Sequence, residues 1–417
     1  MQGERAEPSL GYMPPPMPAQ PLQVLIAGAG VAGLETMMAV RALAGPRVAI
    51  TIVAPNLEFA YRPLAVAEPF GVDDVRSYPL EEIASDFDAT FVRDEVSWVG
   101  VRSQCVFLRG GDEMSYDALV MALGARQRRA WPHVPTFRGP RDVGMMRELV
   151  EEVARGDVGS LAFVVPSGTT WSFPLYELAL LTASRAKEAG VDVDLVLLTP
   201  EREPLAVFGR AASAEVSDLL AAARVRFQGG TSVEVSAENS LFVNGVEAPL
   251  RPDRVLAVPR LEGPAPRGLP CNDDGFIPID PHGLVQHTEH VYAAGDGTDF
   301  PVKQGGIATQ QADAVAEVIA KRAGARVYPR PLRPVLRGYL LANGSSRYLR
   351  GELDHRDSGT SEASESTLWW PADKIAGTYL APYLAAVDAR AKPAVAAHAG
   401  DHPVPITSWV EESPYGE

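Results

Sequence analysis

The feature that most constrains this chain is a glycine-rich turn near its N-terminus, Gly28-Ala29-Gly30-Val31-Ala32-Gly33. A short apolar run, residues 22–27, comes directly before it and predicts a buried strand. The residues that follow have the apolar pattern of a helix that ends near Gly45. A strand, a glycine turn and a helix in immediate succession are typical of a parallel, doubly wound α/β sheet.

Each glycine in this turn has its own physical role. Gly28 permits the tight turn, Gly30 lets the backbone approach a ligand closely, and Gly33 allows the helix to pack against the strand. The first N–H groups of the helix, at Val31 and Ala32, would face an anion such as the pyrophosphate of a dinucleotide. The alternative is a glycine turn that binds no ligand.

One position departs from the usual dinucleotide-binding pattern. An acidic residue is expected about 20 positions after the glycines, at the end of the second strand, where it binds a ribose hydroxyl. In this sequence the second apolar run, residues 48–53, is followed by Ala54. We therefore expect Asn56 or a backbone group to recognise the ribose instead.

A second strand–helix–strand pattern lies in the middle of the chain. Residues 161–166 form an apolar run, residues 173–190 have a helical pattern, and residues 193–198 form another apolar run. Two such units predict an α/β protein with two Rossmann-like, doubly wound domains. The short apolar segments between them, within residues 91–123, indicate an insertion between the two halves of a nucleotide-binding domain.

Charge and composition exclude several classes of protein. Lys and Arg total 38 against 53 Asp and Glu, and the resulting net charge of −15 would repel a nucleic-acid backbone. The only two cysteines, Cys105 and Cys271, cannot form a disulfide framework and fit a reducing compartment. No apolar run approaches the ~18 residues of a membrane span, and no signal peptide is recognisable. We expect a cytoplasmic protein.

Two further segments indicate which dinucleotide the first turn would bind. Residues 116–125, which contain Ala122 and Gly124, and residues 288–296 resemble the later cofactor motifs of two-dinucleotide-domain flavoproteins, the pyridine nucleotide-disulfide oxidoreductase superfamily. Their order and spacing also match that superfamily. The resemblance implies an FAD that is bound non-covalently in the first domain.

The third motif ends in Gly295-Asp296. By the resemblance, Asp296 binds the ribitol of FAD; the alternative is an ordinary turn aspartate. A helix is expected to begin at Gly305-Gly306-Ile307. The resemblance implies that its positive end faces the pyrimidine side of the flavin and stabilises the reduced ring.

Within these flavoproteins the sequence is most similar to sulfide:quinone oxidoreductases and type II NADH dehydrogenases. Residues 61–64, with Arg62, resemble a turn of that group, and residues 301–305 resemble its segment that carries a lysine beside the flavin. Residues 369–384 resemble the C-terminal segment of the sulfide:quinone branch. The resemblance implies that Arg62 contacts the cofactor and that Lys303 raises the flavin reduction potential. A solvated loop lysine is the alternative for Lys303.

The resemblance also predicts how the chain is divided. An FAD-binding domain is split by a degenerate NAD(P)-like domain, and a C-terminal lid or tail follows. The expected bounds are 22–140 with 270–345 for the FAD domain, 141–269 for the NAD(P)-like domain and 346–417 for the C-terminal segment. Residues 1–21 are expected to form a disordered arm, and residues 352–366 a mobile polar loop.

The second domain departs from a working nicotinamide site. Glu177 corresponds to Glu35 of the first domain, and counting back from it places the three glycine positions at Thr170, Ser172 and Leu175. Side chains there would crowd a pyrophosphate. Glu177 is a candidate proton relay, with a solvent-facing glutamate as the alternative.

The loop before this helix carries an indole, Trp171. We expect Trp171 to lie near the flavin and to shape the pocket. The alternative is a tryptophan that packs in the core.

The resembling enzymes oxidise sulfide with redox cysteines, and this sequence lacks cysteines at the corresponding positions. Neither Cys105 nor Cys271 lies in a C-x-x-C pair or where that family's redox cysteines occur, so structural roles are expected. His282, His287 and His290 do not have the spacing of metal ligands, and no metal is expected.

These features predict an FAD-dependent oxidoreductase that passes two electrons from an unidentified small donor to a quinone or another small acceptor. Two alternatives stay open: an NAD(P)H dehydrogenase with an atypical nicotinamide site, and a non-catalytic FAD-binding scaffold. The acidic, Pro-rich C-terminus predicts at most weak peripheral membrane contact. The segment Trp369-Trp370-Pro371 would form a lid or a membrane contact. The sequence leaves open whether the chain forms a homodimer.

Overall fold

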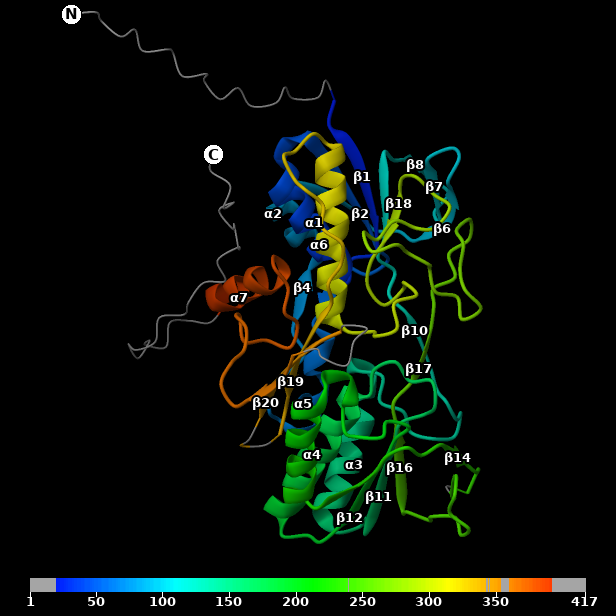
Figure 1. The fold of residues 1–417 in the computed structure, drawn as a ribbon, viewed down its shortest axis with the longest axis vertical. Coiled ribbons are helices and arrows are strands. Elements are labelled where there is room, and N and C mark those ends of the chain that lie inside the picture. Colours follow the sequence, from blue (N-terminus) through cyan, green and yellow to red (C-terminus); the bar gives the residue numbers. More distant parts are fainter. Residues whose placement is uncertain (1–19, 239, 343, 345, 354–359, 392–417) are drawn as a thin grey trace, which may run out of the picture.

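The computed structural model describes residues 20–391 except 239, 343, 345 and 354–359. The expected N-terminal arm therefore lies outside the described residues apart from its last two positions. Two α/β bodies stand one above the other, and the C-terminal segment runs along both (Figure 1).

The upper body is built on a parallel five-stranded sheet with the order β18-β9-β1-β2-β5. Its strands are β1 (Leu22–Ala27), β2 (Val48–Val53), β5 (Ala89–Val92), β9 (Ala118–Met121) and β18 (Val291–Ala293). Because β18 follows the whole second body in sequence, the upper body is made of two separate parts of the chain.

Alternating residues of β1 pack on the two faces of this sheet. Val24 and Ile26 belong to the same core as the helices α1 (Val31–Ala44) and α6 (Gly305–Arg322), which pack against each other. Leu25 and Ala27 face a small antiparallel sheet that covers the other side. Its strands are β6 (Val96–Gly100), β7 (Cys105–Leu108) and β8 (Glu113–Ser115). The first glycine turn lies at the carboxyl end of β1, where ligands bind in open α/β sheets.

The lower body is a parallel four-stranded sheet with the order β13-β12-β11-β16. The strands are β11 (Ser160–Val164), β12 (Asp194–Leu198), β13 (Val225–Gln228) and β16 (Arg254–Ala257). The helices are α3 (Val143–Arg155), α4 (Phe173–Ala189) and α5 (Arg210–Ala222). This body repeats the topology of the upper one on a smaller scale.

Short elements connect and cover the two bodies. The antiparallel pairs are β3 (Glu58–Ala60) with β4 (Ser77–Pro79), β10 (Arg126–Arg128) with β17 (Arg260–Glu262), and β14 (Val233–Val235) with β15 (Leu241–Val243). The remaining helix of the upper body is α2 (Leu80–Asp86). The 3-10 helices are η1 (Gly45–Arg47), η2 (Arg62–Val66), η3 (Glu68–Phe70), η4 (Pro140–Asp142) and η5 (Ala206–Phe208).

The C-terminal segment bridges the two bodies (Figure 1). Its antiparallel sheet consists of β19 (Val335–Leu340), β20 (Arg347–Glu352) and β21 (Ser361–Ser364), and β21 contacts α5 below. Its helix, α7 (Leu380–Ala391), contacts α1 above. The segment is therefore positioned to reach a site between the bodies.

One expectation needs correction here. The polar stretch 352–366 is not a loop throughout, because Ser361–Ser364 pairs with β20 as an edge strand. An edge strand need not show an apolar alternation, so its polar sequence concealed it. Residues 354–359 of this stretch lie outside the described residues.

The expected fold class is confirmed, and so are the positions of the main helices. α1 ends at Ala44, before its C-cap residue Gly45 with a φ of 58°, and α6 begins at Gly305. Within the part of the chain that the structure describes, no helix combines the length and the apolar character needed to cross a bilayer.

Candidate functional site

The three glycines of the first turn differ in what surrounds them. A Cβ added to Gly28 would lie 2.3 Å from the Ala122 carbonyl oxygen, and one added to Gly33 would lie 1.9 Å from the Gly28 oxygen. Packing within the protein therefore requires both glycines. A Cβ added to Gly30 meets no atom within 4 Å, and the φ of Gly30, −85°, is open to any residue. Neither packing nor backbone conformation requires a glycine at position 30. A glycine there fits the close approach of a ligand to the backbone.

The start of α1 is free to bind an anion. Gly30 is its N-cap residue, no side chain caps the helix, and no acidic residue lies in its first turn. The first N–H groups of a helix carry a partial positive charge and lack partners inside the helix. The N–H groups of Val31, Ala32 and Gly33 therefore fit a pyrophosphate group.

The three sequence motifs converge on this helix start. Ala122 abuts Gly28, and a Cβ added to Gly295 would lie 2.9 Å from the Ala32 Cβ. A Cβ added to Gly297 would lie 3.0 Å from the Gly124 carbonyl oxygen. Residues far apart in the sequence thus form one cradle at the carboxyl edge of the upper sheet.

Asp296 is the polar group of this cradle. Its carboxylate makes no hydrogen bond to any described residue, and its nearby charges are Lys303 and Arg62. Burial raises the pKa of Asp296, while the two cations oppose this rise. A half-buried acceptor without a donor fits a hydroxyl-bearing chain such as a ribitol.

Lys303 is buried, with 5% of its surface exposed, so the alternative of a solvated loop lysine is wrong. Its Nζ donates a hydrogen bond to the Thr298 carbonyl and lies 3.9 Å from the centre of the Phe276 ring. Burial lowers the pKa of Lys303 to about 8, although Asp296 and Asp299 favour the charged form. This lysine can therefore change charge near neutral pH.

The start of α6 is less free than that of α1. The Gln304 side chain accepts a hydrogen bond from the Ile307 N–H at 3.0 Å and also donates to the Arg337 carbonyl. Gly305 is crowded by Ile375, whose Cγ1 would lie 3.0 Å from an added Cβ, and Gly306 lies against the Gln304 side chain. The helix keeps its positive end, but one of its free N–H groups is already used.

Ala54 occupies the position after β2, where an acidic residue binds the ribose in dinucleotide-binding folds. Ala54 is buried and its N–H donates to the Val92 carbonyl, while Asn56 is exposed in the loop beyond it. Asn56 is thus available as the substitute that the sequence suggests.

The corresponding region of the lower body is filled by side chains. Ser172, the N-cap residue of α4, donates to the Glu201 carboxylate at 2.9 Å. Tyr176 donates to the same oxygen at 2.8 Å and Thr199 at 3.2 Å. Leu175 is fully buried. Ser172 and Glu201 thus bind each other at the positions where such folds place the pyrophosphate and the ribose of a dinucleotide.

Glu201 was not singled out by the sequence, although its position carries a signal. It follows the second strand of its sheet, β12, where an acidic residue normally binds a ribose. Burial raises the pKa of Glu201, and its three hydroxyl donors oppose the rise. All three hydroxyls donate to the same oxygen of Glu201, Oε2.

Trp171 packs against aromatic rings of the lower body. Its indole stacks on Phe173, with ring centroids 5.2 Å apart and an angle of 6° between the planes, and lies 5.9 Å from Phe208. It is only partly buried. The structure places Trp171 in this aromatic cluster, next to the filled cradle.

Glu177 is buried, with 2% of its surface exposed, so the solvent-facing alternative is wrong. It forms an ion pair with Lys374 of the C-terminal segment and accepts the Leu341 N–H at 2.9 Å. Burial raises the pKa of Glu177, and Lys374 and the Leu341 N–H oppose the rise. Lys374 precedes Ile375, which touches the start of α6 at Gly305. The pair thus joins α4 of the lower body to the C-terminal segment, one residue before the contact of that segment with α6.

Lys374 belongs to a segment that the sequence marked, but its role came only with the structure. In the same segment Trp369 is buried and its indole N–H donates to the Asp373 carbonyl, whereas Trp370 is 42% exposed. One indole of the pair therefore packs inward and the other faces solvent.

Both cysteines are free thiols of the upper body. Cys105 is buried in β7, where its Sγ lies 3.0 Å from the Ser103 hydroxyl, and Cys271 is partly buried in a loop. The structure raises the pKa of both thiols, through a hydrogen bond with Glu113 at Cys105 and through burial at Cys271. Over the described ranges, no three His, Cys, Asp or Glu side chains cluster as a metal site.

Solved structures with the same fold include several oxidoreductases. The sulfide:quinone oxidoreductase of Aquifex aeolicus superposes with a TM-score of 0.72 at 18% identity, over 82% of this chain and 87% of that one. The ferredoxin reductase for the CYP199A2 system of Rhodopseudomonas palustris has a TM-score of 0.58 at 20% identity, over 79% of this chain and 82% of that one.

In sequence, the ferredoxin reductase component of chlorobenzene dioxygenase from Cupriavidus sp. (strain PS12) is 26% identical over 72% of this chain and 75% of its own length. A family model described as pyridine nucleotide-disulphide oxidoreductase matches residues 22–314. The enzyme class predicted from the sequence, an FAD-dependent oxidoreductase, is confirmed at the level of the family. The chain belongs to the pyridine nucleotide-disulphide oxidoreductase family.

Proposed function

We propose that this chain binds FAD in the upper cradle and passes two electrons from a donor other than NAD(P)H to a quinone or another small acceptor. The observation that carries this proposal is the contrast between two helix starts. Neither helix start has a side-chain cap, but α1 begins behind an open Gly30, whereas α4 begins at Ser172, whose hydroxyl donates to Glu201.

Different residues of the upper cradle would bind different parts of the cofactor. The N–H groups at the start of α1 would hold the pyrophosphate, with Gly30 close to it and Asp296 on the ribitol. Gly124 and Gly295 would line the cradle, and Arg62 and Lys303 would supply positive charge beside Asp296. When bound, FAD would supply two-electron transfer between the donor and the acceptor.

The lower body supports a donor other than NAD(P)H. Ser172, Tyr176 and Thr199 donate to Oε2 of Glu201, the carboxylate at the position where such folds bind a ribose. None of the three glycine positions is a glycine, so the backbone there is shielded by side chains. Displacing the network would leave buried hydroxyl and carboxylate groups without partners, at a cost of ~1–3 kcal/mol for each group.

The pair Glu177–Lys374 fits the needs of an acceptor that gains protons together with electrons. A quinone takes up two protons when two electrons reduce it to a quinol. Because burial raises the pKa of Glu177, this carboxyl can hold a proton at a higher pH than an exposed glutamate. We assign Glu177 as the proton relay and Lys374 as the cation that controls its charge.

The test is an anaerobic two-step experiment. The purified flavin-containing protein is first reduced with dithionite and then mixed with the soluble quinone menadione, while the visible flavin absorbance is followed. The proposal predicts rapid return of the oxidised spectrum and a slower return in Glu177→Gln, with an altered pH profile. A wild-type protein that stays reduced in the presence of menadione would contradict a quinone acceptor.

A further inference from the structure

A short stretch of the C-terminal segment, residues 373–375, is clipped to the β3–β4 hairpin of the upper body. The Tyr61 hydroxyl donates to Asp373 Oδ1 at 2.8 Å and accepts the Ile375 N–H at 2.9 Å. Asp373 Oδ1 also accepts the Lys374 N–H at 2.7 Å. One tyrosine and one aspartate therefore hold the backbone on both sides of Lys374.

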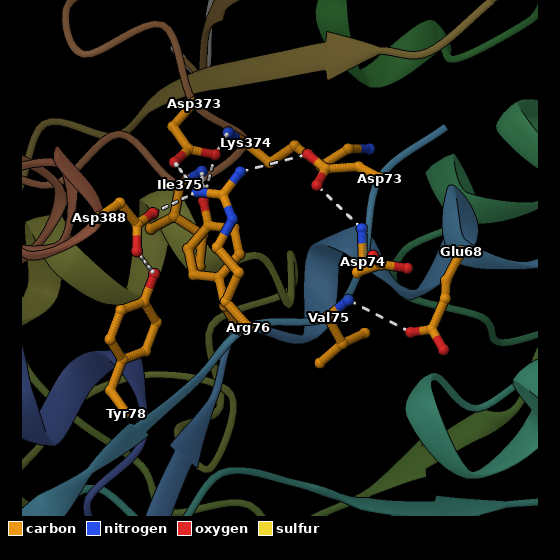
Figure 2. Close-up of polar contacts among 11 residues, drawn as sticks. Glu68, Asp73, Asp74, Val75, Arg76, Tyr78, Asp373, Lys374, Ile375 and Asp388 are labelled. Atoms are coloured by element: carbon orange, nitrogen blue, oxygen red, sulfur yellow. Dashed lines mark hydrogen bonds and ion pairs between the residues drawn. The ribbon is translucent and has the colours of Figure 1, made fainter. Parts of the chain in front are cut away.

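Arg76 supports this clip from the neighbouring strand end. Figure 2 shows its guanidinium between carboxylates of three separate segments: Asp388 at 2.6 Å, Asp73 at 3.2 Å and Asp373 at 4.0 Å. The Tyr61 N–H donates to the Arg76 carbonyl at 2.8 Å, so the two residues are also joined through the hairpin backbone. Asp388 additionally accepts the Tyr78 hydroxyl at 2.9 Å.

The Tyr61 hydroxyl is a dependable donor. Tyr61 is buried, and burial together with the Asp373 charge raises its pKa well above the ordinary value. The phenol therefore keeps its proton across the physiological range and stays bound to Asp373.

The clip compensates for the flexibility of a lysine. A lysine side chain has about 2 kcal/mol of rotamer entropy, and the buried Glu177 carboxylate needs its cation in one place. Fixing the Lys374 backbone on both sides limits the directions that its side chain can take. From these contacts we infer that Tyr61 and Asp373, braced by Arg76, are positioning residues that hold Lys374 against Glu177. This inference rests on the proposed function in taking Glu177–Lys374 as the proton source of the site.

Tyr61→Phe tests the inference, because this substitution keeps the buried ring and removes only the hydroxyl. Tyr78→Phe is the matched control, since it removes a hydroxyl from the same Arg76 cluster but on the Asp388 side. Infrared difference spectra against Glu177→Gln isolate the Glu177 carboxyl band in each background, and its intensity is followed with pH.

We expect Tyr61→Phe to move the midpoint of the Glu177 titration upward by about one pH unit or more, because a displaced Lys374 stabilises the carboxylate less. The pH profile of the rate of flavin reoxidation by menadione should move upward by the same amount in Tyr61→Phe. Tyr78→Phe should leave both the midpoint and the rate unchanged. Asp373→Asn should repeat the Tyr61→Phe shift.

An unchanged Glu177 midpoint in both Tyr61→Phe and Asp373→Asn would overturn the inference, as would equal shifts in Tyr61→Phe and Tyr78→Phe. The infrared titration needs no acceptor, so the two proposals fail separately. If wild-type protein does not reduce menadione while Tyr61→Phe still shifts Glu177, the quinone acceptor is wrong and the positioning role stands. If menadione is reduced and no variant shifts Glu177, the positioning role is wrong.

Discussion

The two α/β bodies share a topology but differ at the start of the helix that follows the first strand of each sheet, α1 after β1 and α4 after β11. In the upper body α1 begins behind Gly30, which faces open space. In the lower body α4 begins at Ser172, whose hydroxyl is bound to Glu201. The same sheet-and-helix frame therefore offers a ligand cradle in one case and a closed polar network in the other. The difference lies in a few side chains and not in the fold.

The two helices also share a buried glutamate that is used to anchor the C-terminal segment. Glu35 of α1 accepts the Tyr379 and Leu380 N–H groups at the start of α7. Glu177 of α4 binds Lys374 and the Leu341 N–H. The C-terminal segment is thus bound to both bodies through equivalent glutamates. The contact at Glu177 includes a buried cation, Lys374, whereas the contact at Glu35 is made through backbone N–H groups.

The largest expected effect is at the open cradle. Gly30→Val should weaken FAD binding at least about a hundredfold, because its side chain would occupy the approach to helix N–H groups that each contribute ~1.5–3 kcal/mol to a charged ligand. Ser172→Val places the same side chain at the equivalent position of the lower body and should leave the flavin content unchanged. Flavin absorbance after gel filtration measures both. Full flavin in Gly30→Val would refute the assignment of the cradle.

The next largest effect is expected at the buried ion pair between Glu177 and Lys374. Lys374→Met leaves the Glu177 carboxylate buried without a cation, and the free energy of unfolding should fall by ~3–5 kcal/mol. Lys321→Met, at an exposed lysine of α6, is the control and should change little. Urea unfolding followed by circular dichroism measures the difference. Equal stability of the two variants would show that the ion pair is not buried.

Asp313, which lies beside Glu35 of α1, should make the free energy of unfolding depend on pH. Burial and the Glu35 charge raise the pKa of Asp313 well above its ordinary value, and Thr378 donates to Asp313 at 2.8 Å. The folded protein therefore holds a proton that the unfolded chain releases near pH 4. This contribution is fully present below that pH and is lost as the pH rises through the raised pKa.

Asp313→Asn should flatten this dependence and exceed the wild-type Tm on the alkaline side by on the order of 2–4 °C. Melting curves recorded between pH 5 and about pH 9 test the sign. A wild-type Tm that rises with pH relative to Asp313→Asn would contradict the account.

The smallest expected effect is on the flavin potential. Lys303→Met should lower the two-electron reduction potential by about 30 mV, which corresponds to about 1.4 kcal/mol. Because the pKa of Lys303 is about 8, wild-type and variant potentials should converge above that pH. Spectroelectrochemical titration at two pH values measures this. A constant gap across pH would mean that the lysine charge is not responsible.

The sequence predicted what depends on local pattern. Short motifs and their order were enough to predict the glycine turn, α1 and the start of α6. They also predicted that the segment of Gly295 and Asp296 lies near the start of α1. The partners of Glu177 and Tyr61 could not be predicted, since Lys374 and Asp373 are distant in sequence and only the packing of the C-terminal segment brings them close. The Glu201 network could have been predicted in part, because the end of this strand is a known place for an acidic residue.

The central claim is that the upper cradle binds FAD while the lower one does not accept a nicotinamide. An anaerobic titration of the purified protein with NADH, followed by the visible absorbance of the flavin, tests this claim most directly. The account predicts a yellow protein that stays oxidised with NADH and is reduced when dithionite is added. Prompt bleaching by NADH would contradict it, because a nicotinamide would then bind despite Ser172, Leu175 and the Glu201 network.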